Sequence, residues 1–318
     1  MFQDRYGRPT LNLRISVTQK CNIKCPYCHR EGESSPSTQM SVEEIVRLSR
    51  IALSLGISRV KLTGGEPLLR QDILEIVRGI AELKGLRDLS MTTNGTLLAP
   101  YAKSLHESGL ARVNVSLPTL NPEKYHELNG GELTNVLDGI KEAVAADFHP
   151  VKLNMLVLKS VNENEIPGMI DFARHSGTIL QLIEFEPVNV NPSYYAGHHY
   201  SLDMVNKELE KQATQVMTRG DMQNRKVYCL PGVTVEVIRP IENTEFCGRC
   251  TRIRLTSDGK LKPCLMRNDN LLDILTPMRN GVDDEKLKKI FLEAIMRRQP
   301  YYRHLNPSCC MLYSVQIS

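Results

Sequence analysis

The sequence lacks the features that mark membrane, secreted and nucleic-acid-binding proteins. No stretch of its 318 residues approaches the roughly 18 consecutive apolar residues of a membrane span, and residues 1–6 contain no apolar core of a signal peptide. Blocks of about five or more like charges are also missing, and the formal net charge is only +4, which suits a phosphorylated small molecule better than a nucleic acid. We therefore expect a cytoplasmic protein with no membrane or nucleic-acid partner.

Nine cysteines in a chain without a secretion signal indicate thiol or metal chemistry rather than a disulfide framework. Cys21, Cys25 and Cys28 form C-x3-C-x2-C directly after the apolar run 11–17. Three thiolates on one loop can hold three irons of a [4Fe-4S] cluster, and an open coordination position marks a catalytic metal. Zinc is the main alternative, although zinc sites favour C-x2-C pairs closed by four ligands. His29 is adjacent to a ligand, so we interpret it as a loop residue.

The hydrophobic pattern predicts an α/β fold. From residue 11 to residue 184, short apolar runs alternate with amphipathic stretches of helical period, which is typical of βα units on a parallel sheet. Helices are expected after Ser41, Asp72 and Thr134, which are suitable N-cap residues. The predicted strands are residues 11–17, 59–62, 88–91, 112–115, 151–158 and 179–183. Six units do not close an eight-unit barrel, so we expect an incomplete (βα)6 TIM-type barrel with a smaller C-terminal cluster-binding domain.

The pattern changes after residue 184. Residues 187–199 are rich in Pro, Asn and Tyr and predict an irregular surface segment, followed by a helix near 202–212. Residues 233–238 alternate as a strand does, and a last helix is expected near 285–297. We predict two domains, a barrel over residues 1–219 that carries the first cluster and a C-terminal domain over residues 220–318 that carries the second.

The motifs follow the carboxyl ends of successive predicted strands. These are the cysteine loop, the sequence Gly-Gly-Glu-Pro at residues 64–67, Thr-Thr-Asn-Gly at residues 92–95, and Ser116. Because ligands bind at this face of parallel α/β sheets, we expect the motifs to meet at one mouth. Residues 63–67 are too short for a P-loop; alone they predict a strand-to-helix turn whose glycines permit close approach to a ligand.

A second cysteine set lies near the C-terminus. Cys247 and Cys250 form C-x2-C, and Cys264 follows after thirteen residues. Three cysteines again indicate an open cluster, although a zinc ribbon completed by Cys229, Cys309 or Cys310 stays possible. Arg252 and Arg254 are two apart on an expected strand, so they share a face and predict a phosphate clamp. A solvated charged strand is the alternative.

The first cysteine set, with Tyr27 before its last cysteine and Gly-Gly-Glu-Pro at the next strand end, resembles the radical S-adenosylmethionine (SAM) superfamily. In that superfamily the open iron chelates SAM, and one electron cleaves it to methionine and a 5′-deoxyadenosyl radical. The resemblance implies that Gly64, Gly65 and Glu66 hold the methionine end of SAM. It also implies that Tyr27 lies against the adenine and that Ser116 is a further SAM contact.

The sequence C-x2-C-T-R-x-R-L-T-S-D-G-K around the second set resembles the GTP 3′,8-cyclase (MoaA) family of molybdenum cofactor biosynthesis. The resemblance implies a lyase with two [4Fe-4S] clusters that converts GTP to (8S)-3′,8-cyclo-7,8-dihydroguanosine 5′-triphosphate, the first step of molybdopterin synthesis. In that reaction the radical takes the ribose 3′ hydrogen, the sugar radical attacks guanine C8, and the second cluster anchors the guanine. The implied GTP contacts are Arg14, Lys61, Thr92, Lys152, Arg252 and Arg254.

The resemblance also implies partners. These are a one-electron donor of flavodoxin or ferredoxin type and a downstream pterin-forming enzyme that receives the product; the protein itself would be a monomer or homodimer. Two alternatives stay open, a radical SAM enzyme with an auxiliary cluster that modifies a peptide or other small molecule, and a non-catalytic iron–sulfur sensor. Arg252 and Arg254 favour a triphosphate over a peptide, and the Gly-Gly-Glu-Pro turn with Ser116 weighs against a sensor.

Several positions depart from the common bacterial pattern of that family. Lys61 and Gln181 stand where arginine is usual, Pro118 replaces an aspartate, and Glu186 replaces a methionine that approaches SAM. Residues 315–318 are not the Gly-Gly tail of many members. These changes affect the expected details of triphosphate and SAM binding. Cys229, Cys309 and Cys310 are interpreted as spare thiols, because each [4Fe-4S] cluster already has its three cysteine ligands.

Overall fold

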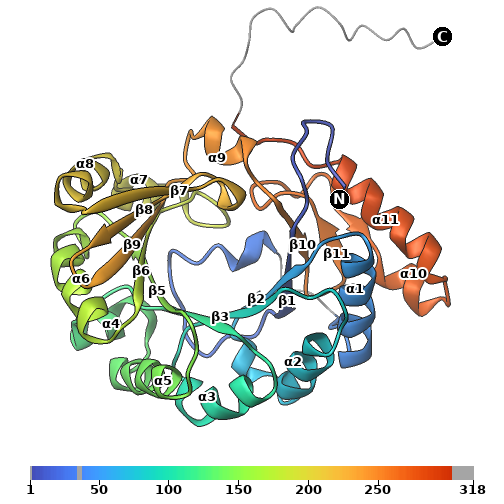
Figure 1. The fold of residues 1–318 in the computed structure, drawn as a ribbon, viewed down its shortest axis with the longest axis horizontal. Coiled ribbons are helices and arrows are strands. Elements are labelled where there is room, and N and C mark those ends of the chain that lie inside the picture. The colour runs from blue at the N-terminus through green and yellow to red at the C-terminus, as the bar shows by residue number, and fades with distance from the viewer. Residues whose placement is uncertain (1, 34–37, 303–318) are drawn as a thin grey trace, which may run out of the picture.

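The computed structural model describes residues 2–33 and 38–302, and six parallel strands form its centre. They follow chain order, and each lies within two residues of its predicted bounds, which confirms this part of the prediction. The strands are β1 (Asn12–Thr18), β2 (Arg59–Gly64), β3 (Asp88–Thr93), β4 (Arg112–Ser116), β5 (Val151–Val157) and β6 (Ile179–Glu184). Figure 1 shows them arranged one after another along a curved sheet.

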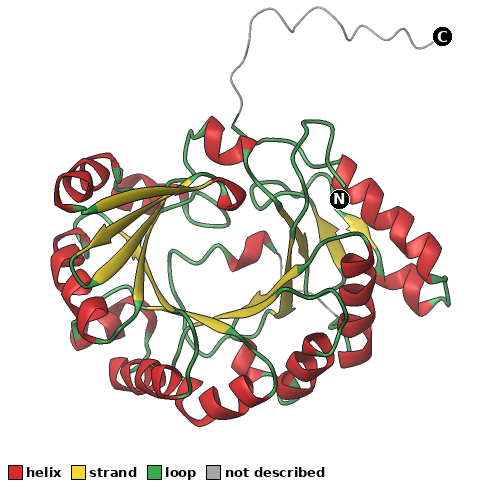
Figure 2. Ribbon diagram, in the orientation of Figure 1, coloured by secondary structure: helices red, strands yellow, loops and turns green. Residues whose placement is uncertain are grey.

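Helices cover the outer face of this sheet, as Figure 2 shows. They are α1 (Val42–Ser54), α2 (Ile73–Ala81), α3 (Leu98–Glu107), α4 (Pro122–Asn129), α5 (Leu133–Ala145) and α6 (Ile166–His175). α1 begins at the predicted capping box of Ser41 and Glu44. α2 follows Asp72 as predicted, but this carboxylate pairs with Arg70 rather than with the helix backbone. The prediction for Thr134 was wrong, because α5 begins one residue earlier and places it inside the helix.

Alternation along the strands separates an apolar core from a polar interior. Ile15, Leu62 and Met91 are fully buried and pack with apolar residues of the helices. Arg14 and Lys61, one residue away on the same strands, face the inside of the barrel. Successive side chains of a strand point to opposite faces, so each strand contributes to the core and to the interior at once.

The C-terminal part of the chain extends this sheet at both edges. The elements after β6 are α7 (Pro192–His198), α8 (Asp203–Gln212), β7 (Gln215–Arg219), β8 (Arg225–Leu230), β9 (Val233–Ile238), α9 (Thr244–Gly248), β10 (Arg252–Leu255), β11 (Lys260–Lys262), β12 (Leu272–Asp273), α10 (Leu275–Arg279) and α11 (Asp284–Met296). The described strands form one sheet in the order β12-β11-β10-β1-β2-β3-β4-β5-β6-β9-β8-β7. β9 runs parallel to β6, and β10 runs parallel to β1.

This arrangement confirms the incomplete α/β barrel and refines the rest. The strand at 233–238 and the helices near 202–212 and 285–297 are present as predicted. Residues 187–199 are not wholly irregular, because they contain α7. The predicted boundary at residue 219 falls at the end of β7, inside the β7–β8 hairpin, and the two-domain division stays a prediction. None of the helices in the described ranges is long and apolar enough to cross a bilayer.

Candidate active site

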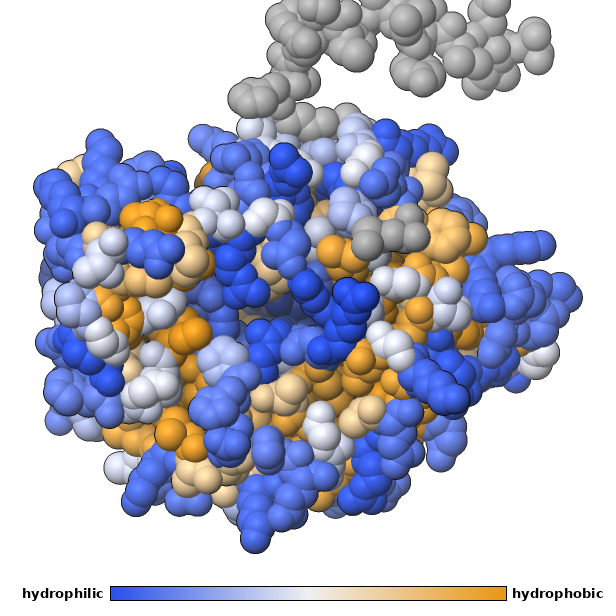
Figure 3. Space-filling model, in the orientation of Figure 1, coloured by the Kyte–Doolittle hydropathy of each residue, from blue (hydrophilic) through white to orange (hydrophobic). Residues whose placement is uncertain are grey.

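The inside of the barrel is a cavity of about 840 Å³, visible as the hollow at the centre of Figure 3 among hydrophilic residues. Its lining includes eleven Lys or Arg residues but only four Asp or Glu residues. The cysteine loop, the glycine pair, Thr92 and Ser116 all contribute to it, so the prediction that these motifs meet at one mouth is confirmed. The excess of positive charge indicates an anionic ligand.

The first cysteine set lines this cavity. Cys21, Cys25 and Cys28 are free thiols. Burial raises the pKa of Cys25 to about 12, and the neighbouring thiols of Cys28 and Cys21 add to the rise. The three sulfurs are therefore near one another, and soft thiolates are the donors that an iron–sulfur cluster takes. No group of three His, Cys, Asp or Glu side chains in the described ranges is arranged to hold a single metal ion; in a cluster, each iron takes one thiolate.

The glycine turn binds the backbone that leads into the cysteine loop. The Gly65 N–H donates to Thr18 O at 2.7 Å and the Glu66 N–H to Lys20 O at 2.8 Å. A Cβ atom on Gly64 would lie 2.1 Å from Thr18 O, and one on Gly65 would lie 2.2 Å from Lys20 O. Gly64 also has a φ of +139°, which L side chains rarely adopt. The sequence predicted close approach to a ligand, and the structure adds close approach to the protein's own backbone.

Glu66 lies behind the cavity wall. It is fully buried, and its carboxylate accepts hydrogen bonds from Leu68 N at 3.0 Å, Thr93 Oγ1 at 2.7 Å and Asn94 N at 2.7 Å. These contacts join the turn after β2 to the turn after β3. Glu66 therefore shapes the site, and its direct contact with SAM stays a prediction.

The other predicted SAM contacts face the cavity. Tyr27 and Ser116 both line it. The Tyr27 ring packs on the small apolar cluster of Leu128, Leu158 and Phe185, and burial raises its pKa well above the usual value. Two of the departures noted above, Pro118 and Glu186, also line the cavity. The Oε2 atom of Glu186 is buried without a hydrogen-bond partner among the described residues.

Four of the predicted GTP contacts lie side by side on β10, β1 and β2. Arg14 is in register with Lys61 on one side and with Arg254 on the other, and Arg252 is in register with Asn12. Arg252 and Arg254 both face the cavity, which confirms that they share a face. Burial lowers the pKa of Arg252 well below its usual value, and the nearby guanidiniums lower it further. Cations that repel one another in this way form a binding site for an anion.

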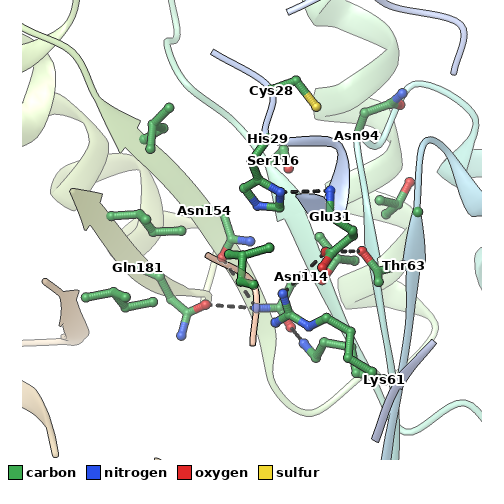
Figure 4. Close-up of a pocket in the computed structure, with 18 of the residues that line it drawn as sticks. Cys28, His29, Glu31, Lys61, Thr63, Asn94, Asn114, Ser116, Asn154 and Gln181 are labelled. Atoms are coloured by element: carbon green, nitrogen blue, oxygen red, sulfur yellow. Dashed lines mark hydrogen bonds and ion pairs between the residues drawn. The ribbon is translucent and has the colours of Figure 1, made fainter. Parts of the chain in front are cut away.

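A polar network crosses the barrel from Lys61 to β9. Lys61 Nζ donates to Asn114 Oδ1 at 2.6 Å, and Asn114 Nδ2 donates to Gln181 Oε1 at 2.8 Å, as Figure 4 shows. The Gln181 amide then donates to the carboxylate of Glu236 on β9. Gln181 is therefore a neutral link between Asn114 and Glu236. Thr92, another predicted GTP contact, lies on β3 opposite Asn114 of β4.

Lys152 is held by the same acidic residue. Its Nζ pairs with Glu236, and Arg219 Nη1 lies 3.0 Å from Glu236 Oε1. Burial lowers the pKa of Lys152 to about 8, although Glu236 acts in the opposite direction. Burial alone would raise the pKa of Glu236, but Lys152, Arg225 and Arg219 bring it to about 2. The pair is therefore ionised and fixes the position of Lys152.

Sequence reasoning missed several residues of this site. Glu31, Arg112, Arg219, Arg225 and Glu236 belong to no motif, and no local signal distinguishes them from surface charges. Glu31 lies just after the cysteine loop, where it contacts Arg14 at 3.3 Å and accepts a hydrogen bond from Thr63 Oγ1 at 2.9 Å. Its own backbone N–H donates to His29 Nδ1 at 2.9 Å, which is the role of a loop histidine.

The second cysteine set is also gathered in space. Burial raises the pKa of Cys247, and Cys250 and Cys264 add to the rise. Burial would raise the pKa of Cys250 as well, but Arg298 and the two clamp arginines lower it. Three free thiols in a cationic setting fit a second cluster. Cys229 lies on β8 opposite Gln215, while Cys309, Cys310 and residues 315–318 lie outside the described residues.

Comparisons with known proteins agree with this geometry. A family model described as the radical SAM superfamily matches residues 15–173, and one described as Molybdenum Cofactor Synthesis C matches residues 178–304. A probable GTP 3′,8-cyclase of Thermococcus kodakarensis is 50% identical over 311 residues, which cover 95% of this chain and 100% of that protein. A probable GTP 3′,8-cyclase of Methanothermobacter thermautotrophicus is 46% identical over 302 residues, 94% of this chain and 98% of that protein.

Solved structures share the fold. SuiB of Streptococcus suis bound to S-adenosylmethionine has a TM-score of 0.65 and 20% identity, and the match covers 89% of this chain and 68% of that one. Native anSMEcpe with bound AdoMet has a TM-score of 0.55 and 19% identity, and the match covers 81% of this chain and 75% of that one. At this level of identity the likeness concerns the fold alone.

Proposed function

Because the chain belongs to the GTP 3′,8-cyclase family of the radical SAM superfamily, we propose that it is the lyase that converts GTP to (8S)-3′,8-cyclo-7,8-dihydroguanosine 5′-triphosphate, the first step of molybdopterin biosynthesis. One observation carries the proposal, a strongly cationic cavity that has one cysteine set at its mouth and the other beside its arginine clamp. The relatives do not favour a peptide-modifying enzyme or a sensor.

Each cysteine set would hold one [4Fe-4S] cluster, the first through Cys21, Cys25 and Cys28, the second through Cys247, Cys250 and Cys264. The bound clusters and SAM supply the one-electron cleavage of SAM and the hydrogen abstraction that follows from it. The protein positions the first cluster and SAM relative to each other. Gly64 and Gly65 fix the turn against the cysteine loop, and with Tyr27, Ser116 and Glu66 they form the proposed SAM site.

The proposed GTP ligands are Arg14, Lys61, Thr92, Lys152, Arg252 and Arg254, and the basic ones among them would bind the triphosphate. The guanidinium forks of the arginines match phosphate oxygens in pairs, while a lysine contributes a point charge. A bound triphosphate would relieve the mutual repulsion of these buried cations. It would also fix the position of the ribose within the cavity.

The surroundings of the first cysteine set support the proposed partners. Cys21 and Cys28 are exposed, so a cluster on this loop would be accessible to an external one-electron donor of flavodoxin or ferredoxin type. The product would pass to a pterin-forming enzyme. We expect a monomer or homodimer in the cytoplasm, where thiols stay reduced.

Anaerobic reconstitution tests the proposal. The protein is incubated with SAM, GTP and a one-electron reductant, and 5′-deoxyadenosine and a pterin derivative of the product are measured. We expect 5′-deoxyadenosine to form in a GTP-dependent manner together with the pterin. SAM cleavage that is slow and indifferent to GTP would reject the substrate while keeping the superfamily assignment.

A further inference from the structure

The β7–β8 hairpin closes the end of the barrel opposite the cysteine loop. Its turn, η4 (Gly220–Met222), contacts residues at the starts of two strands. Arg59 Nη1, on the first residue of β2, lies 2.6 Å from Asp221 Oδ2, and Thr251 Oγ1, just before β10, donates to Asp221 O at 3.1 Å. The cysteine loop and the glycine turn follow the opposite ends of the strands. The hairpin is therefore the floor of the cavity, and Met222 lines it there.

Two arginines of this hairpin face the cavity. Arg219 and Arg225 are direct cross-strand partners, and both line the cavity. Arg219 is paired with Glu236 at 3.0 Å. Arg225 is only 7% exposed. Its Nη2 donates to the neutral Gln223 Oε1 at 3.3 Å, and its Nε is buried without a hydrogen-bond acceptor in the part of the chain that the structure describes.

The surroundings of Arg225 are cationic. Burial lowers its pKa to about 10, and Arg14 and Arg219 lower it as well, although Glu236 opposes them. Arg225 in turn lowers the pKa of Arg252 across the cavity. Within residues 2–33 and 38–302, no carboxylate forms an ion pair with Arg225. A buried guanidinium with an unsatisfied N–H is costly unless a ligand completes its contacts.

We infer that Arg225 is a substrate ligand, which binds the phosphate chain of the guanosine nucleotide from the floor of the barrel. Arg219, which is held by Glu236, lies beside Arg225 on the adjacent strand β7. The phosphates would then lie between the hairpin on one side and Arg14, Arg252 and Arg254 on the other. This inference rests on the proposed function, and it adds the β7–β8 hairpin to the substrate site.

The test compares Arg225→Gln with Lys226→Gln. Lys226 is the next residue on β8 and is exposed, with Glu210 as its ion-pair partner, so both variants lose one positive charge from the same strand. Binding of GTP, GDP, GMP and guanosine to the reconstituted protein is measured anaerobically by calorimetry. For Arg225→Gln we expect GTP affinity to fall on the order of 10- to 100-fold, GDP and GMP affinity to fall by successively less, and guanosine affinity to stay unchanged. Lys226→Gln should bind all four as the wild type does.

Arg225→Lys is the control for a folding defect. It keeps the charge but loses the fork, so it should fold normally and bind GTP with intermediate affinity. An equal loss for guanosine and GTP, or unchanged GTP affinity in Arg225→Gln, would overturn the inference. GTP-dependent SAM cleavage by the wild type is the independent check on the proposed function. If the wild type fails this check, the proposed function is wrong. If the wild type passes it and Arg225→Gln binds GTP as tightly as the wild type, only the contact of Arg225 with the substrate is wrong.

Discussion

Glu31 Oε2 lies 3.5 Å from Arg254 Nε. Glu31 is three residues beyond the last cysteine of the first set, and Arg254 lies between the cysteines of the second set. The same carboxylate contacts Arg14, so one acidic side chain connects the cysteine loop with two of the proposed triphosphate ligands. Glu31 also has a φ of +53°, which is uncommon for a residue other than glycine.

Glu31→Gln removes the negative charge between Arg14 and Arg254. We expect the free energy of unfolding without ligand to fall by about 1–3 kcal/mol, because the buried guanidinium of Arg254 and the half-buried guanidinium of Arg14 lose their counter-charge. GTP would then supply the missing charge, so the increase in melting temperature on adding GTP should be larger than for the wild type. Glu75→Gln on the exposed face of α2 is the control. A smaller GTP-induced increase would contradict this role.

The clamp is tested by Arg252→Ala and Arg254→Ala separately. Each removes charge-assisted hydrogen bonds, and we expect GTP affinity to fall at least about tenfold while GTP-independent cleavage of SAM persists. Calorimetry and the yield of 5′-deoxyadenosine measure the two effects. Arg297 follows α11, is exposed and pairs with Glu293. Arg297→Ala should therefore leave GTP affinity and SAM cleavage unchanged. Wild-type turnover of GTP in both clamp variants would exclude the clamp.

Gly65→Ala tests the contact between the glycine turn and the cysteine loop. The new methyl group would lie 2.2 Å from Lys20 O, and the backbone must move to accommodate it. We expect a loss of about 1–3 kcal/mol in the free energy of unfolding and less iron at the first cluster. Iron is determined chemically in a background of Cys247→Ser and Cys264→Ser, which leaves the first set alone. Gly168→Ala is the matched control, since nothing lies within 4 Å of its Cβ position; equal iron content in the two variants would refute the prediction.

Glu33 predicts a dependence of stability on pH. Burial raises the pKa of its carboxyl to about 7 from the usual 4.5, although Ser257 donates to it. Between these two values the folded state keeps a proton that the unfolded state has lost, so this residue makes the protein less stable as pH rises through the window. Glu33→Gln should remove this slope. Urea unfolding at about pH 5 and about pH 7.5 measures it, with the exposed Glu127→Gln as control; the same slope in Glu33→Gln and the wild type would rule it out.

The sequence by itself determined the chemistry and the frame. Cysteine spacing is local, so both sets were identified before any fold was known. Strand positions followed from short apolar runs, and the shared face of Arg252 and Arg254 followed from the alternation of a strand. The capping box of Ser41 and Glu44 was likewise a local pattern. In each case the residues that interact, or the period that matters, lie within a few positions of one another.

Only the tertiary structure decided how the site is closed. Pairing of β10 with β1 and of β9 with β6 joins residues that are far apart in the chain, and no sequence period specifies such pairings. They bring Arg254 to Glu31, Gln181 to Glu236, and Arg225 to the cavity floor. These side chains look like ordinary surface charges or amides in the sequence. They acquire a role because burial removes water from them and leaves a partner, or a bound anion, to satisfy their charge.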